Sequence, residues 1–157
     1  MNMSAPLEVR RESLSDYVGK PRESQTWMKI TQEMINAFAD ATYDHQFIHV
    51  DPEKAKLSPF GTTVAHGFFT LSLLPRLIES VPLTPQGVVM GVNYGLNKVR
   101  FPNPVKVGSE IRAVATLLEI ANPSPERVLL TSEVVVQIKG QDKPAVVAES
   151  LALFVFA

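Results

Sequence analysis

The sequence contains no cysteine among its 157 residues. This absence excludes disulfide bonds, thiol nucleophiles and zinc sites built on cysteine ligands. The chain also lacks a block of basic residues, and its formal net charge is −1. Nucleic-acid binding is therefore not expected, because it depends on neutralising phosphates. No long apolar run is present either: the stretch GFFTLSLLPRLI (67–78) is too short and too interrupted to span a bilayer.

The overall composition is that of an ordinary globular domain. Hydrophobic residues make up 45% of the chain and charged residues 20%, close to the average for soluble proteins. Residues 1–157 are therefore predicted to form a single domain with its own core. The N-terminal stretch MNMSAPLEVRRESLSDY is charged and lacks the apolar centre of a signal peptide, so a cytoplasmic protein is expected.

The first half of the chain shows two helical patterns. Thr31 is expected to be the N-cap of an amphipathic helix that follows it, since its hydroxyl can accept a bond from the first turn. A short strand is expected before it, in TWMKI (26–30). A second helix begins near Gly67 and is apolar on nearly all sides, which predicts a buried helix. Pro75 is expected to distort its final turn, after about Leu74.

The second half changes to the two-residue alternation of strands. Long strands are predicted in 88–95, 109–120, 127–139 and 145–157. Turn-forming residues separate the last three, and such short connections favour antiparallel pairing. One buried helix followed by a run of long strands predicts an α+β domain, with the sheet wrapped around the helix.

Two aspartates and two histidines crowd together in YDHQFIHVDP (43–52), among apolar neighbours. Ionisable groups in such surroundings are costly unless they have a partner or a function. Asp44 and His49 are a carboxylate and an imidazole within reach across a tight loop, suited to acid–base catalysis near neutral pH. The structural alternative is that Asp44 caps a turn and His49 is a semi-buried histidine with its hydrogen bonds satisfied.

A zinc site is a second alternative for the same stretch. Three histidines, at positions 45, 49 and 66, would suffice for zinc with one open position. HQFIH (45–49) resembles the zinc motif H-E-x-x-H, but Gln46 replaces its glutamate. An extended or irregular backbone is also expected there, which would spoil the helical spacing of the first two histidines. The sequence therefore predicts neither a metal nor a cofactor.

The segment AHGFF (65–69) opens the second helix without Ser, Thr, Asp or Asn immediately before it. Its first amides are then expected to lack a side-chain cap, and such amides attract developing negative charge. Gly67 would let a ligand approach closely; alternatively it only allows tight packing, with Thr62 or Thr63 as the cap. Ser72 is expected to bond back to its own helix.

These motifs together resemble the MaoC-like dehydratases and (R)-specific enoyl-CoA hydratases of the hot-dog fold. The resemblance runs from about Ile30 to the C-terminus and rests on DHQFIH (44–49), GTTVAHGFFTLS (61–72) and NYGLNKVRFPNPVKVGSEIR (93–112). Members carry an aspartate and a histidine in the pattern D-x-N-P-x-H. Asp44 and His49 match those two positions, whereas Gln46 and Phe47 replace the usual Asn-Pro.

The resemblance implies a hydro-lyase that acts on thioesters of coenzyme A or of acyl carrier protein. Water would be added across the C2–C3 bond of a trans-2-enoyl thioester, or removed from an (R)-3-hydroxyacyl thioester. Asp44 and His49 would hold and activate the water, and the Gly67 amide would face the thioester oxygen. Ser72 would support the site, and His66 would shape the loop or touch the substrate.

The resemblance also implies a homodimer with one continuous sheet. Two rival functions remain open: a hot-dog acyl-CoA thioesterase, and a non-catalytic subunit that binds acyl thioesters. The acyl chain length, the choice between coenzyme A and carrier protein, and the physiological direction do not follow from the sequence.

Overall fold

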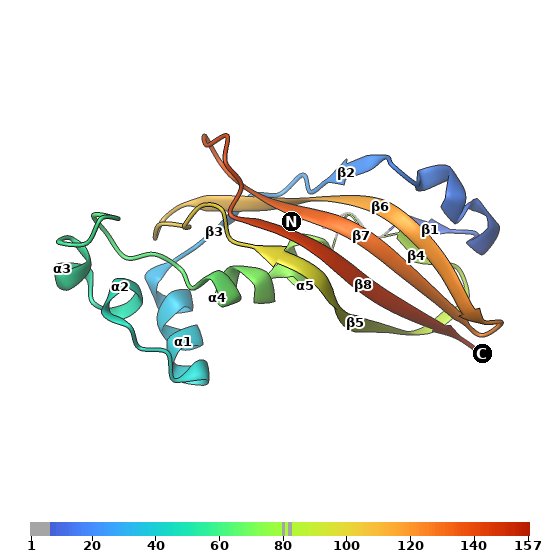
Figure 1. Cartoon of the computed structure of the whole chain (residues 1–157), viewed down its shortest axis with the longest axis horizontal. Coiled ribbons are helices and arrows are strands. Elements are labelled where there is room, and N and C mark those ends of the chain that lie inside the picture. Colours follow the sequence, from blue (N-terminus) through green and yellow to red (C-terminus); the bar gives the residue numbers. More distant parts are fainter. Residues whose placement is uncertain (1–6, 80, 82) are drawn as a thin grey trace.

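A long antiparallel sheet dominates the computed structural model; α1, α2 and α3 gather toward one end of it, and α4 and α5 lie along it (Figure 1). The structure describes residues 7–79, 81 and 83–157. Residues 1–6, at the start of the charged N-terminal stretch, and Ser80, near the end of the second predicted helix, lie outside the described residues. The elements are, in order, β1 (Leu7–Val9), the 3-10 helix η1 (Arg11–Tyr17), β2 (Pro21–Glu23), β3 (Met28–Lys29), α1 (Gln32–Thr42), α2 (Phe47–Val50), α3 (Pro52–Ala55), α4 (Gly67–Ser72), α5 (Leu74–Leu77), β4 (Leu83–Pro85), β5 (Val88–Arg100), β6 (Glu110–Ser124), β7 (Arg127–Ile138) and β8 (Val146–Phe156).

The four long strands confirm the predicted antiparallel sheet. The order of the strands in this sheet is β2-β6-β7-β8-β5, where β2 is short, and β3 pairs with β6 as well. The pairs β6–β7, β7–β8 and β5–β8 are all antiparallel. Apart from this sheet, β1 and β4 form a short parallel pair. Strand β6 runs further than predicted, because residues assigned to the turn still pair with β7 up to Ser124 opposite Arg127.

One face of the sheet forms the core around α4 and α5. Alternate residues of β6, β7 and β8 point to this face and are buried: Ile111, Ala113, Leu117, Val128, Leu130, Val134, Val136, Ile138, Val146 and Ala148. Phe69 of α4, with Leu74 and Leu77 of α5, shares a cluster with most of them. The other three, Leu117, Val128 and Leu130, form a second cluster with Val9, Leu14 and Leu83. Each large apolar side chain buried in this way contributes about 1.5–3 kcal/mol. The predicted α+β domain, a sheet around a helical segment, is confirmed.

Helix α1 begins as predicted. The Thr31 hydroxyl accepts a hydrogen bond from the Met34 N–H at 3.4 Å. The helix ends at Tyr43, whose φ of 61° is left-handed, a backbone conformation that terminates helices.

The expected irregular backbone after α1 is wrong for residues 47–50, which form the single turn α2. Pro52 explains why this helix stops: it disfavours helical backbone at Asp51, which is extended. The Asp51 carboxylate then caps α3 by accepting from the Lys54 N–H at 3.0 Å. Cap formation at this turn therefore belongs to Asp51 and not to Asp44.

The second predicted helix is divided into α4 and α5 at Leu73, one residue earlier than expected. Pro75 lies in the first turn of α5, where its missing N–H costs no helical hydrogen bond. The prediction that this helix is buried nearly all round is wrong on one face, since Phe68 is 69% exposed. No helix in the described part of the chain is both long and apolar enough to cross a membrane.

Candidate active site

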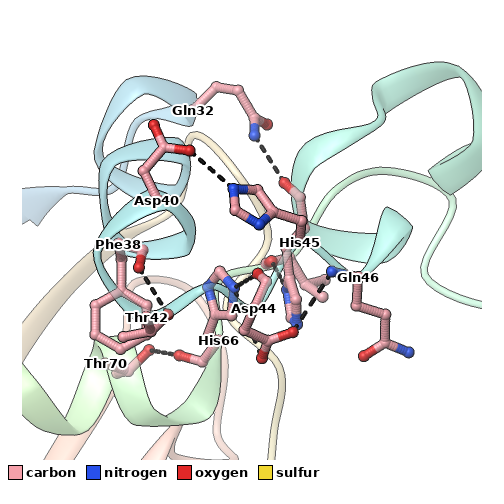
Figure 2. Close-up of polar contacts among 11 residues, drawn as sticks. Gln32, Phe38, Asp40, Thr42, Asp44, His45, Gln46, His66 and Thr70 are labelled. Atoms are coloured by element: carbon pink, nitrogen blue, oxygen red, sulfur yellow. Dashed lines mark hydrogen bonds and ion pairs between the residues drawn. The ribbon is translucent and has the colours of Figure 1, made fainter.

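Three ionisable side chains meet where the end of α1, the turn α2 and the start of α4 come together (Figure 2). Asp44 follows α1, His49 lies in α2, and His66 is the N-cap of α4. One nitrogen or oxygen atom from each lies within 4.8 Å of the others. The fold thus brings together the predicted acid–base pair and a histidine that is distant in sequence.

His49 is buried and held in one orientation. Its side chain is part of a residue that is only 7% exposed, and its Nδ1 lies 2.6 Å from the Val64 carbonyl oxygen. Because a carbonyl oxygen only accepts, Nδ1 must carry the proton, and Nε2 of the neutral ring keeps a lone pair. Burial lowers the pKa of His49 below its ordinary value of 6.5; the Val64 hydrogen bond raises it, the neighbouring His66 lowers it and Asp44 raises it. The net lowering leaves the imidazole neutral at pH 7, with Nε2 able to accept a proton.

His66 is placed to support both members of the pair. Its Nε2 donates to the backbone oxygen of Asp44 at 2.9 Å and lies 4.0 Å from a carboxylate oxygen of the same residue. Its ring stacks on that of His49, with centroids 3.7 Å apart, and Phe38 lies 5.0 Å away. Its Nδ1 is buried and has no hydrogen-bond partner among the described residues.

The Asp44 carboxylate, in contrast, is accessible. Its side chain is 54% exposed, and one oxygen accepts from the Gln46 N–H at 3.5 Å. An exposed carboxylate beside a buried neutral imidazole gives a site that a water molecule and a ligand can both reach.

Gly67 opens α4 with an uncapped first turn, as predicted. His66, the N-cap, makes no side-chain hydrogen bond to that turn. The close approach is made by a neighbouring ring: a Cβ at Gly67 would lie 2.9 Å from Cγ of Phe101, closer than van der Waals contact. Glycine is therefore required here for packing, whatever its amide binds.

Comparison with known proteins shows the family to which this chain belongs. The family model described as MaoC like domain matches residues 13–137. The chain belongs to the MaoC-like family. It is 50% identical to 3-hydroxyacyl-thioester dehydratase Z of Mycobacterium tuberculosis (strain H37Rv) over 147 residues, which cover 92% of this chain and 97% of that protein.

Solved structures of the same family confirm the hot-dog fold. The monoamine oxidase regulatory protein of Archaeoglobus fulgius has a TM-score of 0.79 and 25% identity, with 98% of this chain and 99% of that chain covered. The R-hydratase PhaJ1 of Pseudomonas aeruginosa has a TM-score of 0.67 and 26% identity, with 89% of this chain and 83% of that chain covered.

The MaoC-like chain holds its active loop with a network that sequence reasoning missed. Gln32, at the start of α1, donates to the backbone oxygen of His49 at 2.7 Å and accepts from the Thr63 hydroxyl at 2.5 Å. The sequence suggested Thr63 only as a possible helix cap. Since 31 positions separate Gln32 from Thr63, no local spacing signals this contact.

The structure does not assemble the three histidines of the zinc alternative. His45 lies outside the turn α2, and its Nε2 is 2.8 Å from a carboxylate oxygen of Asp40 (Figure 2). The cluster of Asp44, His49 and His66 still offers zinc-type ligands. However, nitrogen lone pairs lie in the plane of each imidazole, and the two rings stack at only 24° to one another. Stacked rings of this kind do not direct their lone pairs at one shared ion.

Ser72 lies apart from the ionisable cluster of the MaoC-like chain. Its hydroxyl donates to the Phe68 carbonyl at 2.7 Å, the back-bond expected from the sequence. It also lines a groove of about 460 Å³ that runs between the α4–α5 segment and strand β5. The groove begins one turn beyond Gly67 on the same helix, so it is placed to receive a chain attached at the cluster.

Proposed function

We propose that this MaoC-like chain catalyses the reversible hydration of a trans-2-enoyl thioester to an (R)-3-hydroxyacyl thioester. The observation that carries the proposal is the Asp44 carboxylate within 4.8 Å of the His49 imidazole, beside the start of α4. The predicted hydro-lyase class is confirmed at the level of the family, because relatives named above are a dehydratase and an R-hydratase.

The Asp44 carboxylate and the His49 imidazole lie within 4.8 Å of one another, a span that one water molecule can bridge through two successive hydrogen bonds. The neutral Nε2 of His49 takes a proton from the water as its oxygen attacks Cβ. The pair then returns one proton to Cα. The hydroxyl and the proton added to the double bond thus both come from the water, and the enzyme ends as it began. Each well-placed group contributes about 10²–10⁴-fold to the rate.

Negative charge develops on the thioester oxygen while the enolate exists. The uncapped amide of Gly67 at the start of α4 is our candidate for binding that oxygen. Loss of one such donor costs about 2.7–4 kcal/mol in enzymes where it has been removed. His66, whose Nε2 is engaged by the Asp44 backbone, would position the loop instead of binding the thioester. Ser72 would contact the acyl chain in the groove.

We infer that the chain acts as a single domain in a two-fold homodimer assembled through β5. This strand lies at the edge of the sheet and pairs only with β8 among the described strands. Large apolar side chains along it are exposed: Val89, Met90, Val92, Tyr94 and Leu96. A long apolar edge of this kind is a template for strand pairing, and a two-fold dimer is the commonest closed solution. A cytoplasmic location remains our expectation.

The first test is loss of the enoyl-thioester absorbance when purified protein meets crotonyl-CoA and longer 2-enoyl-CoAs, with a thiol reagent present. Loss of absorbance without free thiol, together with an (R)-3-hydroxy product, is expected. Release of free coenzyme A would instead support a thioesterase. If neither occurs with coenzyme A or carrier-protein substrates, a non-catalytic binding subunit becomes the better account.

A further inference from the structure

Arg22 on the edge strand β2 points toward the core face of the sheet. It pairs with Ala115 of β6, and residues opposite one another in an antiparallel pair direct their side chains to the same face. Ala115 lies in the inward-facing series that includes Ala113 and Leu117. The neighbouring Glu23 points to the other face, where it binds Arg112 at 2.9 Å.

The guanidinium of Arg22 has no counter-ion among the described residues. One of its two terminal nitrogens is buried and has no hydrogen-bond partner there. Burial lowers the pKa of Arg22, and the nearby Tyr17 raises it to a lesser extent. Arg22 as a whole is only partly buried, but a buried guanidinium nitrogen without a partner is costly, and an anion from outside the chain would satisfy it.

A cavity of about 70 Å³ lies beside this guanidinium. Most of its wall is apolar and comes from β6, β7, β8 and the segment after α5. Its polar lining consists of Lys20, Arg22 and the hydroxyls of Ser132 and Ser150, which stand opposite each other on β7 and β8. No acidic side chain lines it among the described residues. The site is therefore apolar, positively charged and equipped with hydroxyl donors.

The cavity adjoins the groove assigned to the acyl chain. Ile78 and Ser150 line both spaces. The groove starts near Gly67, and α4 and α5 lead from there to Leu77, next to Ile78, which lines both spaces. A chain attached at the thioester and laid along α4 and α5 would therefore point its far end at the cavity that Arg22 lines.

We propose that this cavity binds a carboxylate at the far end of the acyl chain, so that the chain accepts ω-carboxyacyl thioesters. The carboxylate pairs with Arg22 and receives hydrogen bonds from Ser132 and Ser150. The inference rests on the proposed function, because it assumes that the thioester lies at Gly67. It adds a specificity site at the opposite end of the substrate.

A purely structural account of Arg22 also exists, and it makes different predictions. An inward-pointing charge on an edge strand discourages that edge from pairing with another sheet. This role would make Arg22→Met self-associate, yet would leave affinity for every acyl chain unchanged.

The test measures binding of saturated thioesters by calorimetry, so that it does not depend on turnover. The mono-CoA thioesters of decanedioic, dodecanedioic and tetradecanedioic acids are compared with plain acyl-CoAs of equal length. We expect the wild-type chain to prefer the carboxyl end at one of the longer lengths. Arg22→Met should lose about tenfold in affinity for that ligand, the size expected for a charge-assisted pair. Arg22→Lys should retain part of the preference.

Arg127→Met, which removes an exposed arginine that does not line the cavity, is the matched control and should bind both ligand series like wild type. Equal affinities for the two chain ends, or a carboxyl preference that survives in Arg22→Met, would overturn the proposal. Free dodecanedioate and free laurate complete the comparison: Arg22-dependent binding of these acids, without any end preference among the thioesters, would identify a free carboxylate effector and reject the substrate tail. Hydration of crotonyl-CoA by the wild-type chain tests the proposed function separately, because so short a chain does not reach Arg22.

Discussion

Polar rings are buried at the helical end of the molecule, whereas large apolar side chains are exposed along the free edge of its sheet. At the helical end, the ionisable rings of His49 and His66 are buried. Along β5, large apolar side chains such as Val89 and Tyr94 are each 63% exposed. Buried polar groups and exposed apolar patches are the informative exceptions in a folded protein.

The two regions also differ in whether their unusual side chains find partners within the chain. Each of these two buried imidazoles donates to a backbone carbonyl of the same chain, His49 to Val64 and His66 to Asp44. The outer edge of β5 meets no other described strand. The hydrogen bonds that orient the acid–base pair therefore lie within one chain, whereas the sheet edge would be covered by a second copy in the dimer we propose. Phe101, just beyond the end of β5, joins the two regions because its ring covers Gly67.

The largest effect is expected from breaking the helical end. Asp44→Asn and His49→Gln should each reduce turnover at least about a hundredfold, because each removes one of the two groups that handle the proton of the attacking water. Glutamine keeps a donor for the Val64 carbonyl, so folding and dimerisation should persist. Enoyl-CoA kinetics and light scattering measure the two outcomes.

His45→Gln is the matched control for these variants, since His45 is exposed and pairs with Asp40. It should retain normal turnover. Near-normal activity in Asp44→Asn or His49→Gln would reject the proposed mechanism.

A change on β5 should disrupt the proposed dimer and leave the His49 site intact, the reverse of the variants above. Tyr94→Glu puts a negative charge on the exposed edge strand of each copy, so the proposed dimer would bring like charges into its interface, which costs several kcal/mol. The dimer should dissociate at concentrations where the wild-type chain remains paired, as judged by sedimentation. The NMR signals of the His49 ring should stay in place, because its hydrogen bonds lie within one chain.

Leu118→Glu supplies the comparison, as Leu118 is 43% exposed on the central strand β6. It should remain dimeric. If Leu118→Glu dissociates as readily as Tyr94→Glu, β5 is not the interface.

A smaller effect, on stability, is expected at the contact between Gly67 and Phe101 that joins the two regions. Gly67→Ala forces its new methyl group against the Phe101 ring, and overpacking of this kind costs about 1–3 kcal/mol. Phe101→Ala removes the obstructing ring, so the double variant should be less destabilised than the sum of the two single ones. Urea denaturation of the four proteins gives this coupling, and strict additivity would contradict the contact.

The sheet could be predicted from sequence because its signal is local. Two-residue alternation marks each of the strands β6, β7 and β8, and the connections between them are short. The turn α2 was missed because one helical turn is too short to be stable alone. It is held by distant residues, such as the Val64 N–H that donates to the Ile48 carbonyl at 3.0 Å.

In the candidate site, too, local features could be predicted from the sequence and long-range contacts could not. Asp44 and His49 were found from their spacing and from the resemblance to a family. The bond from His66 to the Asp44 backbone spans 22 positions, and that from Thr63 to Gln32 spans 31. Such contacts depend on how α1, α2 and α4 pack. The inward direction of Arg22 likewise follows only from the register of β2 on β6.

The smallest expected effect concerns pH and belongs to the helical end alone. Burial, aided by the stacked His66, lowers the pKa of His49 although the Val64 bond and Asp44 oppose this. Since His49 must be neutral to accept a proton, kcat/KM should fall in acid only as the pH drops below the ordinary histidine value of 6.5. The unfolded chain takes up this proton at higher pH than the folded chain. His49 therefore contributes stability that is present above its unfolded pKa and lost as the pH falls through the folded pKa.

The variant His66→Asn sharpens this prediction. Asparagine can still donate to the Asp44 backbone but removes the second imidazole, so the acid limb of the kcat/KM profile should move upward. The shift should be partial, because burial is the larger cause of the lowered pKa. Tyr94→Glu should leave the limb unchanged wherever it remains active, since β5 contributes no group to the pKa of His49. An acid limb at or above the ordinary histidine value in the wild-type chain would mean that His49 is protonated when it should accept, and the proton would then have to be taken by Asp44.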